Sequence, residues 1–310
     1  MAGLHGGVAA NVVKTALDLV FDAEFDYSGG AYTATAENPL VFNQSTADKA
    51  AVITEQFMGG GYWKSRAELA DVSSGNNLVG NQKTFSIVNY SDSRDVSKNL
   101  FDDDQHDVVQ MMVKSMARNG RLTRDKNAFD YINGGFATNT TNDGAHIFSA
   151  SHTTLSGDTV SNLGSGALSE ATLETQINAL YEQKTQDGTL GGHEPACLLV
   201  PPALFKEAVI FTKSELRPTT TNNDLNYVSM IYPGLQVYRS PFLGSAQSGS
   251  DTAWFLLSRN HSLYRWVRQA IVKDIVDYKF QRNNNYIYKA EYRETVGAIS
   301  YEGITGNLGT

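Results

Sequence analysis

The chain has 310 residues, of which 41% are hydrophobic and 19% are charged, as expected for an ordered protein with a substantial core. Its net charge of −8 and isoelectric point near 5.3 argue against a dedicated nucleic-acid-binding protein, because neutralising phosphates requires a basic surface. The single cysteine, Cys197, excludes an internal disulfide framework, and its apolar neighbours predict a buried thiol.

Targeting and membrane segments are not evident in the sequence. No stretch approaches the roughly 18 apolar residues of a membrane span. The N-terminus lacks the basic and long apolar regions of a signal peptide. We therefore expect a protein that is made in the cytosol and has no membrane partner.

The N-terminal region predicts a helix followed by an extended arm. Within residues 9–25, Val13, Leu17 and Phe21 recur every four positions, which is typical of an amphipathic helix. A glycine pair and Pro39 then predict irregular chain. Such an arm adds little to a compact core, so we expect it to lie across a neighbouring molecule; a disordered terminus is the alternative.

Residues 58–99 predict a long two-stranded excursion with few apolar side chains. Glycine and asparagine turns divide the segment, and a strand is expected around Phe85. An isolated hairpin of this kind is marginal in water and needs support from another surface. The three glycines at 59–61 are not a phosphate-binding loop, because no Gly-Lys-Ser/Thr follows them.

The strongest helix signal follows Asp102, Asp103 and Asp104, where negative charge favours a helix N-terminus. Apolar residues then recur every four positions up to the glycines at 134–135. One continuous helix of roughly 28 residues would be about 42 Å long. Two helices meeting near Gly120 are the alternative. The aspartates could also bind a divalent cation, but they lack calcium-loop spacing, and a helix start is favoured.

The middle of the chain predicts mixed helix and strand. Residues 136–166 are rich in Thr, Ser, Asn and Gly and predict a loop. A helix is expected from Ser169, as its N-cap, to Lys184. A buried strand at 197–200 is followed by a helix over residues 202–212.

The last third predicts mainly strands, after a polar loop at 219–226. Strands are expected at 235–239 and 254–258, and the tail alternates apolar and polar residues, which indicates antiparallel strands with one buried face. Its tyrosines could stack on nucleic acid together with two nearby arginines, but packing across strands is favoured. The residues concerned are Tyr286, Tyr288, Tyr292, Arg282 and Arg293.

The charge is distributed unevenly. Residues 259–293 contain eight basic and three acidic residues, whereas the rest of the chain carries a net charge of −13. A basic segment and an acidic remainder could meet between subunits, where charge complementarity gives specificity. Ordinary solvated strands explain the pattern equally well.

The histidine-containing loop invites a catalytic or metal-binding hypothesis. His146 and His152 lie near Asp143 and Ser151, but a spacing of six matches no common ligand pattern. No Gly-x-Ser-x-Gly motif supports a nucleophilic serine. We predict hydrogen bonds that order the loop, and no catalytic, cofactor-binding or metal-binding residue.

Several motifs in a fixed order resemble the major capsid proteins of tailed bacteriophages, in particular the Mu-like major head subunits with the HK97-type fold. The resemblance covers about residues 50–300, and each motif is weak alone. The motifs lie at 100–104, 143–152, 187–208, 254–257 and 289–297.

The resemblance implies an α+β, HK97-type capsid fold with an N-terminal arm, an extended β-hairpin loop, a long spine helix, an axial domain and a peripheral domain. The corresponding boundaries are 1–57 for the arm, 58–99 for the extended loop, 100–164 for the spine helix and first peripheral part, 165–260 for the axial domain, and 261–310 for the second peripheral part.

The resemblance also implies a non-enzymatic function as a major head protein of the virion. Copies would self-assemble in the host cytoplasm into hexamers and pentamers of an icosahedral shell that encloses double-stranded DNA without reading its sequence. Portal, scaffold and decoration proteins are further expected partners. The expected contacts between subunits are Trp63, Tyr62, Lys64, Lys83 and Arg66, with Trp63 as the main anchor because buried aromatic residues dominate such interfaces.

Three alternatives stay open. An encapsulin-type compartment shares the fold but encloses cargo protein. A hydrolase that uses His152 is less favoured, and a tail or adhesin protein would form fibres or tubes. In the type member of the fold, a loop lysine and an asparagine join subunits covalently. Lys64 and Lys83 lie in the matching region here, but no Asn or Glu partner is identified, so we expect no crosslink.

Overall fold

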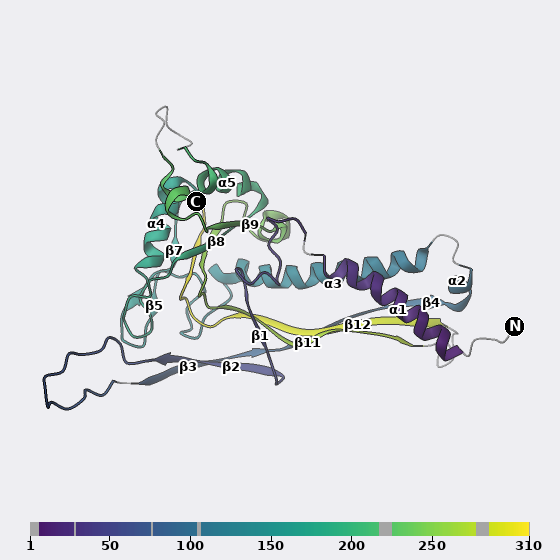
Figure 1. The fold of residues 1–310 in the computed structure, drawn as a ribbon, viewed down its shortest axis with the longest axis horizontal. Helices are drawn as coiled ribbons and strands as arrows, with labels where there is room; N and C mark the ends of the chain where they lie inside the picture. The colour runs from purple at the N-terminus through teal and green to yellow at the C-terminus, as the bar shows by residue number, and fades with distance from the viewer. Residues whose placement is uncertain are drawn as a thin grey trace.

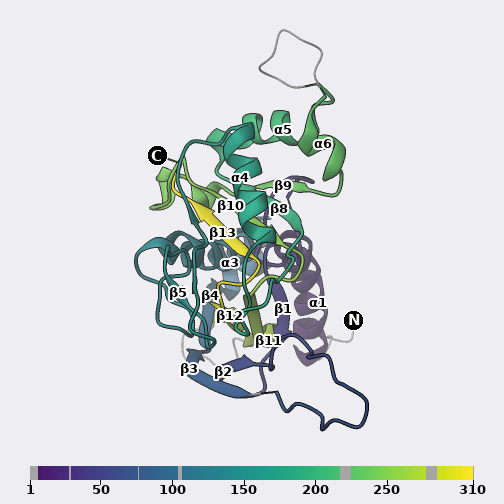
Figure 2. The same ribbon diagram turned by 90° about the vertical axis from the view of Figure 1, so that its left-hand side faces the viewer.

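The computed structural model describes residues 6–27, 29–75, 77–103, 107–216, 225–276 and 285–309. It combines a long sheet covered by two helices, a compact sheet flanked by helices at one end, and a two-stranded hairpin whose loop projects beyond them (Figure 1). Seen from the end, the hairpin loop stands away from both sheets (Figure 2). The predicted mixture of helices and sheets is confirmed.

The long sheet has the strand order β1, β11, β12 and β4. Strands β11 and β12 pair antiparallel along most of their length, and β1 joins β11 in parallel. Tyr288, Ala290 and Tyr292 of β12 alternate into the core, which confirms the predicted buried face and the packing role of these tyrosines. The strands are β1 (Asn43–Thr46), β4 (Val88–Ser97), β11 (Leu263–Val276) and β12 (Asn285–Ala298).

Helices α1 (Gly6–Phe25) and α3 (Val108–Asn133) cover one face of the long sheet (Figure 1). Their buried apolar residues share a core with the inward side chains of β4 and β12. Helix α3 passes through Gly120 without a break, and its 26 residues span about 39 Å. The single long helix is therefore confirmed, and the two-helix alternative is wrong.

The three aspartates do not start this long helix, contrary to prediction. Asp102 is the last residue of a short helix, α2 (Lys98–Asp102), whose N-terminus is capped by the Ser97 hydroxyl. Helix α3 begins after Asp107, which has left-handed backbone (φ 54°) and makes no side-chain cap. The Ser97 hydroxyl accepts the Leu100 N–H in the first turn of α2, so helical structure begins just after Ser97, upstream of the three aspartates. Asp104 lies outside the described residues.

The compact sheet has the strand order β7, β13, β10, β8 and β9. Every residue of β8 and β10 is buried, because apolar clusters cover both faces of the sheet. Cys197 in β8 is fully buried, as predicted, and this burial raises the pKa of its thiol. The strands are β7 (Leu163–Gly164), β8 (Pro195–Val200), β9 (Gln236–Arg239), β10 (Trp254–Ser258) and β13 (Ile304–Asn307).

The end of the chain does not stay with the long sheet. Strand β13 pairs antiparallel with β10, so residues 304–307 belong to the compact sheet. The resemblance implies that residues 261–310 form the second part of the peripheral domain, and the pairing of β13 adds a link from this part to the compact sheet. The Tyr301 side chain is buried beneath the 183–190 segment and its hydroxyl donates to the Lys184 carbonyl, which directs the chain back to this sheet.

Helices and short turns flank the compact sheet. Ser169 caps α4 as predicted, since its hydroxyl accepts the Thr172 N–H. The helix ends before Lys184, which instead bridges to Leu190. The α-helices are α4 (Glu170–Tyr181), α5 (Phe205–Lys213) and α6 (Tyr227–Ile231). The 3-10 turns are η1 (Gly134–Phe136), η2 (Pro202–Leu204), η3 (Pro241–Leu243) and η4 (Ser245–Gln247).

The hairpin lies further upstream than predicted. Its strands are β2 (Ala51–Met58) and β3 (Leu78–Ser86), which pair antiparallel. Residues 88–97, expected in the excursion, form β4 of the long sheet instead. The strand pattern of β2 was hidden by its mixed polarity. Residues 136–166 are mostly loop, as predicted, with the two-residue strands β5 (His152–Thr153) and β6 (Thr159–Val160).

Within the described residues, no helix is both long enough and apolar enough to cross a membrane.

Candidate assembly surfaces

The loop at residues 59–77 joins the two strands of the hairpin and is fixed at its base. The Gly59 N–H donates to the Asp187 carboxylate at 2.5 Å, and the Leu190 N–H donates to the Tyr62 hydroxyl at 3.2 Å. Gly60 and Gly61 adopt positive φ angles of 95° and 73°, which side-chain-bearing residues rarely adopt. The Asp187-Gly188 motif therefore holds the base of the loop.

Beyond this base, the loop exposes large apolar side chains to solvent. Trp63 is 101% exposed, so no part of its side chain packs against its own chain. Tyr62, Leu69 and Val72 are also largely exposed. A solvated tryptophan indicates a surface made for a partner.

Four of the five predicted contact residues lie on this loop. Tyr62, Trp63, Lys64 and Arg66 are exposed together. Lys83 lies instead on β3, where its ammonium donates to the carbonyl and hydroxyl oxygens of Thr140. Lys83 thus joins the hairpin to its own body, and this burial lowers the pKa of its amine despite nearby Asp143.

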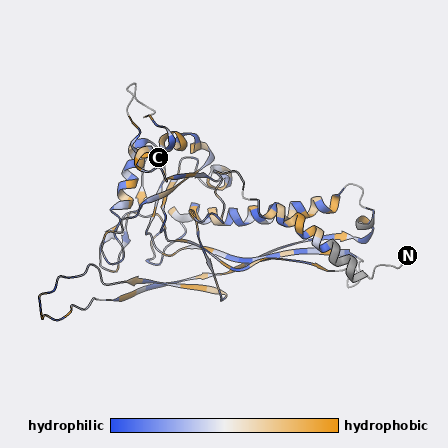
Figure 3. Ribbon diagram, in the orientation of Figure 1, coloured by the Kyte–Doolittle hydropathy of each residue, from blue (hydrophilic) through white to orange (hydrophobic). Residues whose placement is uncertain are grey.

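An apolar stripe that was not predicted from the sequence lies on the hairpin itself. Ile53, Phe57 and Val79 are about 60% exposed and lie on the face turned away from the body. Figure 3 shows hydrophobic stretches along the ribbon of the hairpin, below the long sheet. The signal was present as alternating residues from Ile53 onward, but this segment had been assigned to the arm.

A second apolar patch lies at the tip of the compact sheet's helical layer. It combines exposed side chains of α6 with those that flank residues 217–224. Its members are Leu216, Leu225, Tyr227, Met230 and Ile231.

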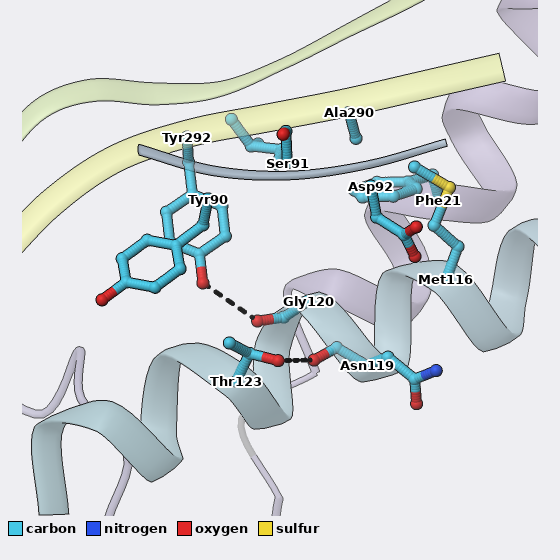
Figure 4. Close-up of a pocket in the computed structure, with 11 residues that line it drawn as sticks. Phe21, Tyr90, Ser91, Asp92, Met116, Asn119, Gly120, Thr123, Ala290 and Tyr292 are labelled. Carbon is cyan, nitrogen blue, oxygen red and sulfur yellow. Dashed lines mark hydrogen bonds between the residues drawn. The ribbon is translucent and has the colours of Figure 1, made fainter. Parts of the chain in front are cut away.

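A groove lies between α1, α3 and the long sheet (Figure 4). It has a volume of about 240 Å³, and Phe21 and Met116 form its apolar floor. Tyr90 and Tyr292 stack at one side with ring centroids 5.1 Å apart, and the Tyr292 hydroxyl donates to the Gly120 carbonyl at 3.5 Å. The lining of the groove therefore includes several aromatic rings and a methionine side chain.

The predicted histidine site is a buried structural cluster. His152 is fully buried, and its ring nitrogens lie 2.7 Å from the Asp143 carboxylate and 3.1 Å from Asn162 Oδ1. Its ring stacks on Tyr301 with centroids 4.7 Å apart. His146 and Ser151 are exposed and do not join the cluster. Both ring nitrogens are occupied and no surface is open to a substrate, so the hydrogen bonds order the loop, as predicted.

Hydrogen bonding also shifts the pKa of the Asp143 carboxyl in this cluster. Burial by itself would raise the pKa of Asp143. The bonds from His152, Thr141 and the Ala145 N–H outweigh burial and hold the pKa of this carboxyl below its usual range.

The extended arm is fastened to the body by buried charges. Asp125 of α3 accepts the Ala36 N–H at 2.8 Å, and Arg124 pairs with Glu37 at 2.5 Å. Burial raises the pKa of the Asp125 carboxyl, which the Ala36 N–H only partly offsets. The arm segment at 34–46 therefore packs on its own body before any neighbour is present, which the sequence did not reveal.

Among the described residues, no three His, Cys, Asp or Glu side chains are grouped as a metal site would require. Asp103 is exposed beside the end of α2.

The comparison that decides the family is one of sequence. The sequence model described as "Phage capsid protein" matches residues 81–307, which is well over half of the chain. The chain belongs to the phage capsid protein family. This capsid protein is therefore a shell-forming component of a virion, and its family is structural. No curated protein matches its sequence significantly.

Solved structures agree on the fold of this capsid protein. The capsid structure of the cyanophage P-SCSP1u has a TM-score of 0.57 at 10% identity, covering 90% of this chain and 89% of that chain. A virus-like particle from Pyrococcus furiosus has a TM-score of 0.54 at 9% identity, covering 95% and 99%. The capsid of Myoviridae phage XM1 has a TM-score of 0.52 at 10% identity, covering 92% and 95%.

Identities near 10% establish a shared fold and nothing finer. The predicted HK97-type capsid fold and the role as the major capsid protein are confirmed. The closer resemblance to Mu-like head subunits stays a prediction.

Proposed function

We propose that copies of this capsid protein assemble into hexamers and pentamers that close an icosahedral shell around double-stranded DNA. The observation that carries the proposal is the hairpin loop: it is fixed at its base, yet it exposes Trp63 completely. An ordered apolar protrusion is unfavourable in water unless another subunit covers it. The apolar stripe on β2 and β3 extends this uncovered surface.

The electrostatics fit a container better than a nucleic-acid reader. The net charge of −8 does not favour sequence-specific or tight DNA binding, which depends on neutralising phosphates with basic residues. DNA would be enclosed without base contacts. We further propose assembly in the host cytoplasm, with portal, scaffold and decoration proteins as partners.

The domain division is also a proposal. The arm would end near residue 50, where β2 begins, the extended loop would comprise the hairpin at 51–86, and the spine helix would lie in the 100–164 part. The axial part, at 165–260, would turn its exposed patch of Leu216, Leu225, Tyr227, Met230 and Ile231 toward other subunits. Residues 261–310 would complete the peripheral domain, apart from β13.

Electron microscopy with light scattering tests the proposal. We expect the purified protein to form closed shells, or rings of five and six subunits. A monodisperse monomer across several salt and pH conditions would contradict it. Fibres or tubes would support a tail protein instead.

A protein-filled compartment of the encapsulin type is the second candidate, favoured by the similarity to the virus-like particle from Pyrococcus furiosus. Particles from the natural source distinguish the two, because a phage head contains nuclease-protected DNA and a compartment contains cargo protein. Shells made from the chain expressed alone would not separate them.

A further inference from the structure

Trp63 is held in place as well as exposed. The neighbouring Tyr62 is tethered through its hydroxyl to the Leu190 N–H, and Gly59 is tethered to Asp187. The backbone on the N-terminal side of Trp63 is therefore fixed, while its indole makes no contact with the body. A preorganised aromatic side chain loses little conformational entropy when it is buried.

The groove between α1, α3 and β4 is a complementary surface. Phe21, Met116 and the stacked Tyr90 and Tyr292 provide apolar walls, and Met116 brings a sulfur that favours aromatic partners. Asp92 lines the groove with a half-exposed carboxylate, whose Oδ1 already accepts hydrogen bonds from Arg94 and the Ser93 N–H. A carboxylate there can accept the indole N–H, which needs an acceptor once it is buried.

We propose that Trp63 of one subunit inserts into the groove formed by Phe21, Tyr90, Met116 and Tyr292 of a second copy of this chain. This inference rests on the proposed shell and names the surface that receives the loop. Lys64 follows Trp63 directly and is opposite in charge to Asp92, which lies at the groove and also pairs with Arg94 of its own chain.

The occupant is a second copy because the chain's own loop lies elsewhere. Figure 1 shows the hairpin loop at one end of the molecule and α1, with the start of α3, toward the other. Figure 2 shows the loop projecting away from both helices. A contact that joins different surfaces of identical subunits is heterologous, and such contacts form rings when the rotation between subunits closes.

Other cavities fit an indole less well. The cleft next to His193 and Arg259 has a volume of about 590 Å³ and a mainly polar lining. The apolar hollow beside Leu17 and Tyr286 measures about 10 Å³, which is too small. The Tyr90 groove alone among these three combines sufficient volume with a mostly apolar lining.

Disulfide trapping tests the contact directly. Thr123 lines the groove from the exposed side of α3, and Ser65 is exposed two residues after Trp63. Ser65→Cys combined with Thr123→Cys therefore places one thiol on each surface and keeps Trp63 itself. The native Cys197 is fully buried and should not compete. Ser65→Cys with Lys114→Cys is the matched control, because Lys114 is exposed on the same helix but does not line the groove.

We expect oxidised particles with the Thr123 pair to give a ladder of linked subunits on non-reducing gels, at least tenfold stronger than the control pair. Shells seen by microscopy without this ladder would overturn the inference and leave the proposed shell intact, as would equal linking by both pairs. Protein that stays monomeric would overturn both.

A second measurement avoids engineered thiols. Trp63→Ala removes only an exposed side chain, so the fold should persist, which the fluorescence of buried Trp254 and Trp266 can verify. We expect the concentration needed for assembly to rise about 30-fold, equivalent to about 2 kcal/mol for an interface anchor. Thr123→Trp fills the groove and should raise the concentration needed for assembly by a similar factor. A change below twofold in both variants would contradict the proposal.

Discussion

Replacing His152 by alanine distinguishes a structural histidine from a catalytic one. The ring is fully buried, bonds to Asp143 and Asn162, and stacks on Tyr301. His152→Ala should therefore destabilise the fold, and no hydrolytic activity should depend on the residue.

The size of this effect follows from the contacts. The bond to the Asp143 carboxylate is charge-assisted and contributes about 1.5–3 kcal/mol, and the bond to Asn162 contributes about 1 kcal/mol. Asp143 keeps bonds from Thr141 and the Ala145 N–H, and Asn162 keeps the Ser149 N–H, so neither is left unpartnered. The void left by the ring adds to the loss. We expect His152→Ala to lower the free energy of unfolding by about 3 kcal/mol.

Urea unfolding followed by tryptophan fluorescence measures this loss, under conditions where subunits are unassembled. His146→Ala is the matched control: His146 is exposed six residues upstream, so it should change stability by less than about 0.5 kcal/mol. A stable, correctly folded His152→Ala protein, or the loss of a hydrolase activity in that variant, would refute the reasoning.

Three further predictions concern the loops and a helix cap. The folded-state pKa of Asp143 lies below its unfolded value, so the carboxylate stabilises the fold fully above about pH 4, and this stabilisation declines as the pH falls through the folded pKa. The difference in free energy of unfolding between wild type and Asp143→Asn should therefore shrink as the pH is lowered. A difference that stays constant with pH would contradict this. Asp187→Ala should accelerate hydrogen exchange at the Gly59 amide about tenfold, with the distant Leu173 amide as control, and unchanged exchange would show that the carboxylate does not fix the loop. Ser169→Ala should lower the free energy of unfolding by about 1 kcal/mol in urea titration, whereas Ser169→Asp should restore most of it; equal stability of all three would rule out the cap.

Much of the fold could be predicted because its signals are local. The spacing of apolar residues along α3, the Ser169 cap and the alternation in β12 each reflect a period that one segment imposes by itself. The buried run at Cys197 needed only its own composition. The resemblance in motif order supplied the family, which the composition could not.

The pairing of strands that are distant in the sequence could not be predicted in the same way. Residues 88–97 look like hairpin sequence, yet they extend the long sheet because β12 offers a matching edge. Residues 304–307 leave the tail for the compact sheet because β10 and β7 lie on either side of them. Strand partners are chosen by tertiary packing, and neither strand records the choice alone.

The candidate assembly surfaces, too, were determined partly by the sequence and partly by the tertiary structure. The sequence determined which side chains are costly to leave in water, so Trp63 could be named as an anchor from its residue type and its place in a weakly apolar loop. Tertiary structure decided that Lys83 bonds to Thr140 within its own chain, and that Phe21, Tyr90 and Met116 meet in one groove. Exposure is a property of the folded surface, and it arises only when segments far apart in the sequence have packed together.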